Sequence, residues 1–272
     1  MSPPSPHADR FRVLLAALLG IGVGAIAIAA AVVIAHGRVS SQNANARTPR
    51  TLEWSSWHPS AGGNEGATQI ADYIAPFYRL TNSQQLAVVT PVNVTQLTAS
   101  GSFTGNGLTV ALNTASAGSA PTLRPLSGET VAYDLCGQGG PNCALGGTPS
   151  TLRLLLLRRE ALELAMYTFE YLPKSENVVA VLPPGRSSAS THGHPVTVAV
   201  LFVRSEIAPL LAQPADATLQ EYPPTLAQLK AWKQTTEAGL VDTITSRNLF
   251  AERVETEQTG SNLLVLNPLP AQ

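Results

Sequence analysis

The segment from Val13 to Ala35 constrains this chain most, because its 23 residues (VLLAALLGIGVGAIAIAAAVVIA) carry no charge, no amide and no hydroxyl group. As a helix rising 1.5 Å per residue it would reach about 35 Å, enough to cross a hydrocarbon core about 30 Å thick with a modest tilt. A helix satisfies its own backbone hydrogen bonds inside lipid, whereas a core helix of this length would normally carry a polar stripe. The segment therefore predicts a transmembrane helix, with the lipid bilayer as the partner of residues 13–35.

A cleaved signal peptide is the alternative that the sequence leaves open. Its apolar stretch would be about 7 to 15 residues long. The stretch here is longer, and the small residues Ala44 and Ala46 lie well past its end, so we expect an uncleaved anchor. A short tail (residues 1–12) before the span favours a cytoplasmic N-terminus, because a long C-terminal domain crosses the membrane largely regardless of its charge. The expected location is the cell membrane, with a single pass and the C-terminal domain outside the cytoplasm.

Beyond the span, residues 36–53 are polar, lack periodicity and contain Pro49, which is typical of a flexible linker. Trp54 and Trp57 then open the ordered part, and we expect them to pack in the core or at its edge. Residues 54–272 are long enough for one large extracytoplasmic domain. The chain has 17 Lys and Arg against 18 Asp and Glu, with no run of either sign. A protein that binds nucleic acid would need a basic stripe, so this class of partner is excluded.

The pattern of residues 54–272 predicts an α+β fold, a mixed sheet with helices in a single domain. Short β-branched runs predict strands at residues 85–96, 107–112, 129–135, 177–182, 195–203, 248–257 and 262–266, the last two joined by a turn at residues 259–261. Apolar residues at helical spacing predict helices at residues 65–80, 151–172 and 207–212, with another after Pro224. Pro76 is expected to end or kink the first of these.

The helix at residues 151–172 is the clearest expected element, with Ser150 or Thr151 as its N-cap. One apolar stripe should face the core: Leu154, Leu157, Ala161, Leu164, Ala165, Phe169 and Leu172. The charged residues of the opposite face are expected to be solvated: Arg153, Arg159, Glu160, Glu163 and Glu170. Arg158 falls within the apolar stripe. It could hold an anionic ligand, but a buried Arg paired with a carboxylate or with backbone carbonyls is the commoner case.

Cys136 and Cys143 are the only cysteines, and they flank a Gly- and Pro-rich stretch (LCGQGGPNC) that can turn tightly. In an oxidising compartment this pattern predicts one structural disulfide, worth about 2–3 kcal/mol. A metal site and two free thiols are the alternatives. Zinc usually needs two close-spaced ligand pairs, and a second pair is missing.

His192 and His194 lie on either side of Gly193 in a Pro-, Gly- and Ser-rich stretch and could join a metal site, as could His58. No further ligand can be assigned from the sequence, so we interpret the pair as part of a surface loop. The chain has no nucleophile elbow, no HExxH zinc motif, no phosphate-binding loop and no dinucleotide fingerprint. We therefore predict no catalytic residue, no cofactor and no metal.

Five segments resemble a family of uncharacterised, membrane-anchored proteins of actinobacteria. They are WSSWHP (residues 54–59), QIADYIAPFYRL (69–80), LCGQGGPNC (135–143), LLLRREALELAMYTFEYL (155–172) and LVLNPL (264–269). The resemblance covers most of the domain and the anchor. It implies the membrane-anchored topology and no catalytic activity.

The functional expectation is a non-enzymatic, membrane-tethered binding or assembly module whose partner is another envelope protein. The anchor and the lack of any catalytic constellation lead to this expectation. The alternative is a cell-envelope enzyme or metal-binding protein that uses the loop histidines. The sequence identifies no small-molecule ligand.

Overall fold

The computed structural model describes residues 53–97, 103–104, 107–115, 120–140, 143–184, 197–256 and 262–269. The helices are α2 (Gly63–Ile74), η1 (Ala75–Phe77, a 3-10 turn), α3 (Thr151–Tyr171), α4 (Arg204–Leu211), α5 (Ala215–Thr218), α6 (Leu229–Trp232) and α7 (Thr236–Ser246). The strands are β1 (Arg79–Thr81), β2 (Gln84–Gln85), β3 (Val88–Val92), β4 (Gln96–Leu97), β5 (Phe103–Thr104), β6 (Thr109–Asn113), β7 (Leu123–Pro125), β8 (Glu129–Cys136), β9 (Ser175–Leu182), β10 (Val198–Val203), β11 (Leu249–Thr256) and β12 (Asn262–Pro268).

The predicted tail, anchor and most of the linker (residues 1–52) lie outside the described residues. In the described ranges, no helix is both long and apolar enough to cross a bilayer. The fold begins at Glu53, where the chain enters a compact unit that runs to its C-terminus.

One mixed sheet of eight strands organises the domain, in the order β3-β8-β9-β10-β11-β12-β6-β7. Strands β8 and β9 run parallel because α3 crosses over between them, and β12 and β6 form the other parallel pair. The remaining neighbours in the sheet are antiparallel, including the predicted hairpin of β11 and β12. The sheet and helices confirm the predicted α+β class.

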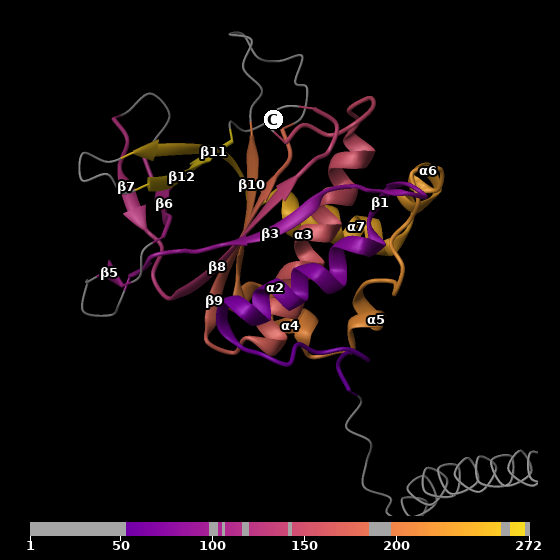
Figure 1. Ribbon diagram of the computed structural model, residues 1–272, viewed down its shortest axis with the longest axis horizontal. Helices are drawn as coiled ribbons and strands as arrows, with labels where there is room; N and C mark the ends of the chain where they lie inside the picture. The colour runs from indigo at the N-terminus through magenta and orange to yellow at the C-terminus, as the bar shows by residue number, and fades with distance from the viewer. Residues whose placement is uncertain are drawn as a thin grey trace, which may run out of the picture. The chain divides into compact units, whose positions relative to one another are not determined.

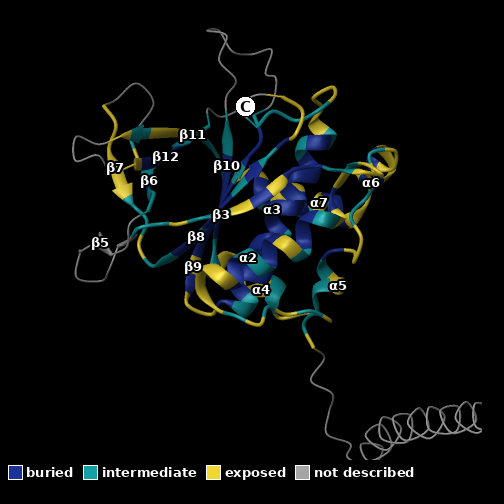
Figure 2. Cartoon of the chain, in the orientation of Figure 1, coloured by how far each residue is buried: buried dark blue, intermediate teal, exposed yellow. Residues whose placement is uncertain are grey.

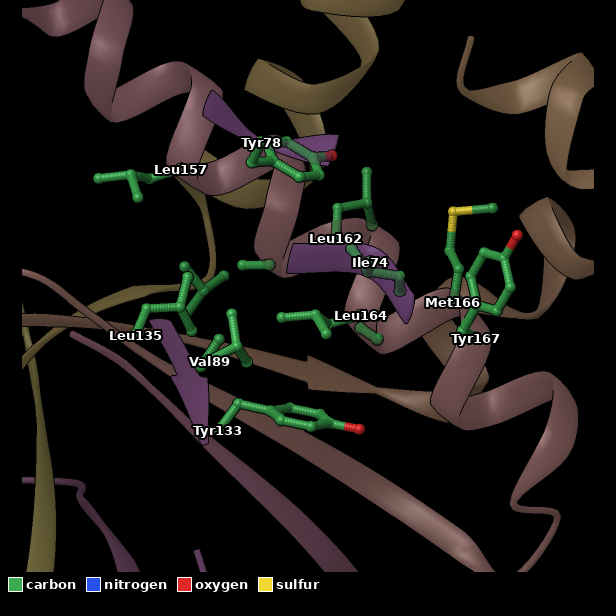
Figure 3. Close-up of a cluster of buried hydrophobic side chains, with 14 of the residues drawn as sticks. Ile74, Tyr78, Val89, Tyr133, Leu135, Leu157, Leu162, Leu164, Met166 and Tyr167 are labelled. Atoms are coloured by element: carbon green, nitrogen blue, oxygen red, sulfur yellow. The ribbon is translucent and has the colours of Figure 1, made fainter. Parts of the chain in front are cut away.

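The helices gather on one side of strands β3, β8, β9 and β10 (Figure 1). Between them lies the main core, to which the sheet contributes Tyr133, Leu135 and Phe202 among others. Figure 3 shows how core side chains of α3 and the sheet lie close together, with Tyr167 at the end of the cluster. Helix α3 and strands β9 and β10 are mostly buried, whereas α4 and α5 are largely intermediate or exposed (Figure 2).

The second face of the same central strands is also buried. Ala132, Val179 and Leu201 on that face form a smaller apolar cluster with Val110 of β6 and Leu264 of β12. The sheet therefore curls, and a bridge between Val94 and Leu108 joins the chain after β3 to the start of β6. Burial on both faces explains why β9 and β10 are nearly continuous runs of apolar residues.

Helix α3 departs from the prediction in its environment but not in its limits. It spans Thr151–Tyr171, and the Ser150 hydroxyl accepts a hydrogen bond from the Arg153 amide, as an N-cap should. The face predicted to be solvated is largely covered, however: Arg153, Arg159 and Glu160 are buried. This prediction was wrong because α2, α6 and α7 pack against α3 in addition to the sheet.

The other helices follow the expected pattern less closely. Pro76 does interrupt the first one, since α2 stops at Ile74 and gives way to η1, and Leu80 lies in β1. The short helix expected at residues 207–212 is α4, which starts three residues earlier. The helix expected after Pro224 begins only at Leu229. Helices α5 and α7 were not predicted.

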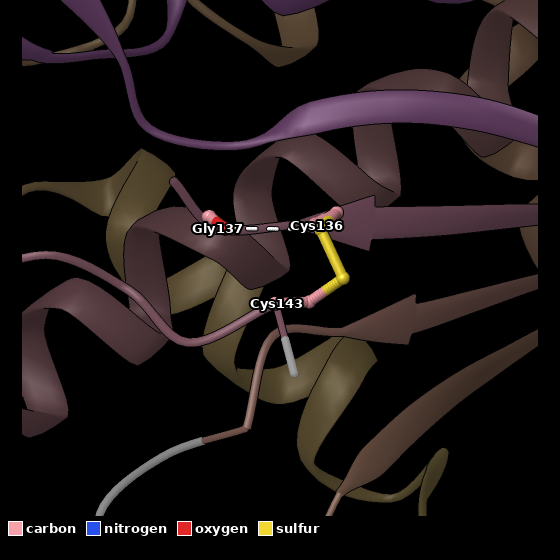
Figure 4. Close-up of a disulfide and its surroundings, with 3 residues drawn as sticks. All are labelled: Cys136, Gly137 and Cys143. Carbon is pink, nitrogen blue, oxygen red and sulfur yellow. Dashed lines mark hydrogen bonds between the residues drawn. A yellow bond between two sulfur atoms is a disulfide. The ribbon is translucent and has the colours of Figure 1, made fainter. Parts of the chain in front are cut away.

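Cys136 and Cys143 form the predicted disulfide, with their Sγ atoms 2.08 Å apart (Figure 4). Two backbone hydrogen bonds link the described residues on the two sides of this bond. The amide of Gly137 donates to the carbonyl of Cys143, and the amide of Gly139 donates to that of Ala144. The disulfide closes a small loop between the end of β8 and the start of α3, so its role is structural.

Candidate functional site

Seven aromatic side chains form a continuous series of ring contacts, which we call the aromatic stripe: Trp54, Trp57, Tyr73, Phe77, Tyr167, Tyr171 and Tyr222. They come from residues 53–62 before α2, which we call the entry segment, and from α2, η1, α3 and the loop after α5. Trp57 stacks flat on Tyr73, with ring centroids 4.2 Å apart. Phe77 meets both Tyr73 and Tyr222 edge-on, at 5.6 and 5.9 Å. The two edge-to-face contacts of Phe77 have the geometry that aromatic pairs prefer.

The stripe runs from the core to the surface. Tyr167 is buried, whereas Trp54, Trp57, Tyr73 and Tyr171 are half-buried. At the far end Phe77 is 38% exposed and Tyr222 is 63% exposed. Together with Val88, Leu123 and Val254, they are the large apolar or aromatic side chains that the described residues leave most exposed. Phe77 and Tyr222 thus form a small exposed aromatic patch at the surface.

The entry segment is held in place by polar contacts as well as by rings. The Ser55 and Tyr167 hydroxyls are hydrogen-bonded at 2.7 Å, and the carbonyl of Trp54 accepts from the amide of Ala215 at the start of α5. Ser60 donates from both its amide and its hydroxyl to the side chain of Gln69 on α2. The two tryptophans are therefore fixed features of the domain, and the prediction that they pack at its edge is confirmed.

A buried ionic network lies beside the stripe. Arg159 donates to Glu237 at 2.7 Å, to Glu163 at 2.9 Å and to the hydroxyl of Tyr78, which in turn donates to Glu163 at 2.5 Å. The indole of Trp232 donates to the other oxygen of Glu237. Burial alone lowers the pKa of Arg159, but Tyr78, Glu163 and Glu237 outweigh it and raise that pKa. The guanidinium is thus charged and fully paired.

This network fixes the loop that carries Tyr222. Arg159 donates to the carbonyl of Gln220 at 2.5 Å, and the amide of Gln220 donates to Glu237. Both backbone groups of the residue two positions before Tyr222 are therefore tied to buried charges. The exposed ring of Tyr222 therefore projects from a loop whose backbone is hydrogen-bonded to buried charged side chains.

Glu160 is the unusual member of this region. It is 0% exposed, and neither carboxyl oxygen has a hydrogen-bond partner among the described residues. Burial and the neighbouring Glu163 raise its pKa well above the ordinary value. The folded state therefore favours the protonated, neutral form of this side chain, because an unpaired buried carboxylate would cost far more.

The predicted candidates are spread over the fold and do not meet in one place. Arg158 donates to the Thr245 hydroxyl and to Asp242, at 2.6 and 2.8 Å, which confirms the structural ion pair expected for it. His58 is exposed and lies against Tyr171. His192 and His194 lie outside the described residues. Within the part that is described, no group of three or more His, Cys, Asp or Glu side chains could hold a metal ion.

Comparisons with protein-family models, with curated proteins and with solved structures found no match to this chain. The resemblance to membrane-anchored actinobacterial proteins therefore stays a prediction.

Proposed function

We propose that this chain is a single-pass membrane-anchored protein whose domain, residues 54–272, is a non-enzymatic module that binds another envelope protein. The anchor is supported by the uncharged segment at residues 13–35, which has the composition and length of a membrane span. The disulfide between Cys136 and Cys143 fits an oxidising compartment outside the cytoplasm.

The observation that carries the binding role is the exposed end of the aromatic stripe. Phe77 and Tyr222 contact each other, and both leave a substantial part of their rings in water. Water contact with apolar rings costs free energy, about 25 cal/mol for each Å² left uncovered. Aromatic side chains are enriched in the centres of protein interfaces, where this cost is recovered. The rigid loop that presents Tyr222 reduces the entropy lost on binding.

A site-specific photo-crosslinking experiment tests this proposal in the full-length chain in its own membrane. A photoreactive phenylalanine analogue replaces Tyr222 in one variant and Val254 on β11 in the other. The two positions are similarly exposed, at 63% and 57%, so Val254 is a matched control. We expect a discrete crosslinked protein from position 222 that is lost when Trp57→Ala is added. Equal products from both positions, or none from position 222, would contradict the binding role.

A further inference from the structure

The charges around the aromatic stripe point to the chemistry of its partner. Three exposed carboxylates each directly precede a stripe residue in the sequence: Glu53, Asp72 and Glu221. None of them forms an ion pair with any side chain that the structure describes. The stripe is therefore flanked in the sequence by three exposed carboxylates, which we call its acidic rim.

Basic side chains are nearly missing from this rim. Within two residues of a stripe residue in the sequence, the only Lys or Arg is Arg79, which follows Phe77 by two positions and begins β1. Arg79 donates to the carbonyl of Asn82 in its own hairpin. The same window contains Glu170 in addition to the three exposed carboxylates. Carboxylates therefore outnumber basic side chains four to one in this sequence window. Among the described residues, the two cations that reach the region from elsewhere are already occupied: Arg159 pairs with Glu163 and Glu237, and Arg204 donates to the carbonyls of Ser175 and Leu172.

The exposed rings complement these carboxylates. The π face of Trp or Tyr carries negative potential and attracts the guanidinium of Arg or the ammonium of Lys. A guanidinium that stacks on a ring can also hydrogen-bond to a nearby carboxylate. Inside the same protein, Arg159 lies over the ring of Tyr78 while it pairs with Glu163, which shows this combination in the core.

We propose that the aromatic stripe, with its acidic rim, binds an Arg- or Lys-bearing segment of the partner protein. This inference rests on the proposed function and specifies its partner. The cationic side chain stacks on the exposed end of the stripe, at Tyr222 and Phe77. It pairs there with Glu221, while the half-buried rings of Trp57 and Tyr73 continue the contact surface and Asp72 pairs with a second cation.

The three tryptophans make this proposal measurable. Trp54 and Trp57 belong to the stripe, whereas Trp232 is buried and its indole donates to Glu237. In the full-length protein, held in neutral detergent micelles and labelled with ¹⁵N-tryptophan, each indole gives one signal. The probe is the peptide acetyl-GRGRGRG-amide. Its control has citrulline, a neutral group of the same shape, in place of each arginine.

We expect the arginine peptide to shift the signal of Trp57, and that of Trp54 to a smaller extent, while Trp232 stays in place. The citrulline peptide should bind at least roughly fivefold more weakly, and 0.5 M NaCl should weaken the arginine peptide to a similar degree because salt screens exposed charges. The double variant Asp72→Asn with Glu221→Gln should reproduce this loss. Glu255→Gln on β11, away from α2 and α5 in Figure 1, removes one carboxylate that pairs with Arg253 and should leave binding unchanged.

Equal binding of the citrulline peptide, or binding that ignores salt and the two rim substitutions, would overturn the cationic partner. So would a neutral chitin oligosaccharide that moves the Trp57 signal when the arginine peptide does not, because the stripe would then be a sugar platform. These results are separable from failure of the binding role itself. A crosslink at position 222 would still show a protein partner, but one that is recognised without a basic segment.

Discussion

Replacing the buried acid Glu160 by methionine should make the domain more stable, and increasingly so as the pH rises. Methionine is unbranched like glutamate but has no carboxyl group to bury. Burial and Glu163 hold the pKa of Glu160 well above its ordinary value of 4.5. The folded state therefore retains a proton that the unfolded chain releases once the pH exceeds that ordinary value.

The sign and the size follow from this difference in bound protons. Between the unfolded and the folded pKa of Glu160, the free energy of unfolding of the natural protein falls by about 1.4 kcal/mol for each pH unit. The Glu160→Met variant has no carboxyl group at this position, so its free energy of unfolding does not fall with pH for this reason. Below the ordinary pKa the gain should be only that of removing two unpaired polar atoms, about 1–3 kcal/mol.

Urea unfolding of both proteins at several pH values between 4 and 8, followed by tryptophan fluorescence, measures the difference directly. Glu206→Gln on α4 is the control, because Glu206 is exposed and its amide counterpart can still accept from Asn248. A stability gain for Glu160→Met that is the same at every pH, or a loss at high pH, would refute the assignment of a neutral buried acid.

Three further outcomes are expected. Arg159→Met should lower the free energy of unfolding by about 3–5 kcal/mol, since it leaves buried carboxylates unpaired; a loss below 1 kcal/mol in urea titrations would contradict the network. Replacing Cys136 and Cys143 together by alanine should cost about 2–3 kcal/mol, the entropy of the small loop that the bond closes, and reduction with dithiothreitol should give the same shift in midpoint. The full-length chain should stay in membranes during an alkaline carbonate wash, and deletion of residues 13–35 should release it; extraction of the intact chain would exclude the anchor.

The parts of the fold that could be predicted are those where a single element carries its own pattern. Strand β9 is a short apolar run between polar turns, and α3 combines a cap at Ser150 with helical spacing over five turns. Helix α7 was missed because Gly239 and several Thr residues lower its intrinsic helix propensity. It forms because it packs on α3 and because the Thr235 hydroxyl caps it.

The candidate site was harder to foresee, since it depends on contacts between distant segments. Trp57 and Tyr73 were assigned to separate elements, and no spacing rule connects either with Tyr222. One available signal was overlooked in α3. In addition to the apolar residues predicted to face the core, α3 carries Leu155, Leu156, Leu162 and Met166. Apolar residues therefore surround the helix. A helix that is apolar all round is a buried helix. That feature indicates that Arg159 and Glu160 lie inside the protein.

The attachment of the entry segment has a mechanical consequence. Any tension on the chain from residues before Glu53 reaches the domain first at Trp54 and Ser55, which are fastened to α5 by a backbone hydrogen bond and to α3 by the hydroxyl of Tyr167. A pull at this end is passed to the central helix and not to the rim of the sheet. Peeling the segment away would break up the stacked rings before it disturbed any strand, so a stretched chain would lose its aromatic surface while its sheet stayed folded.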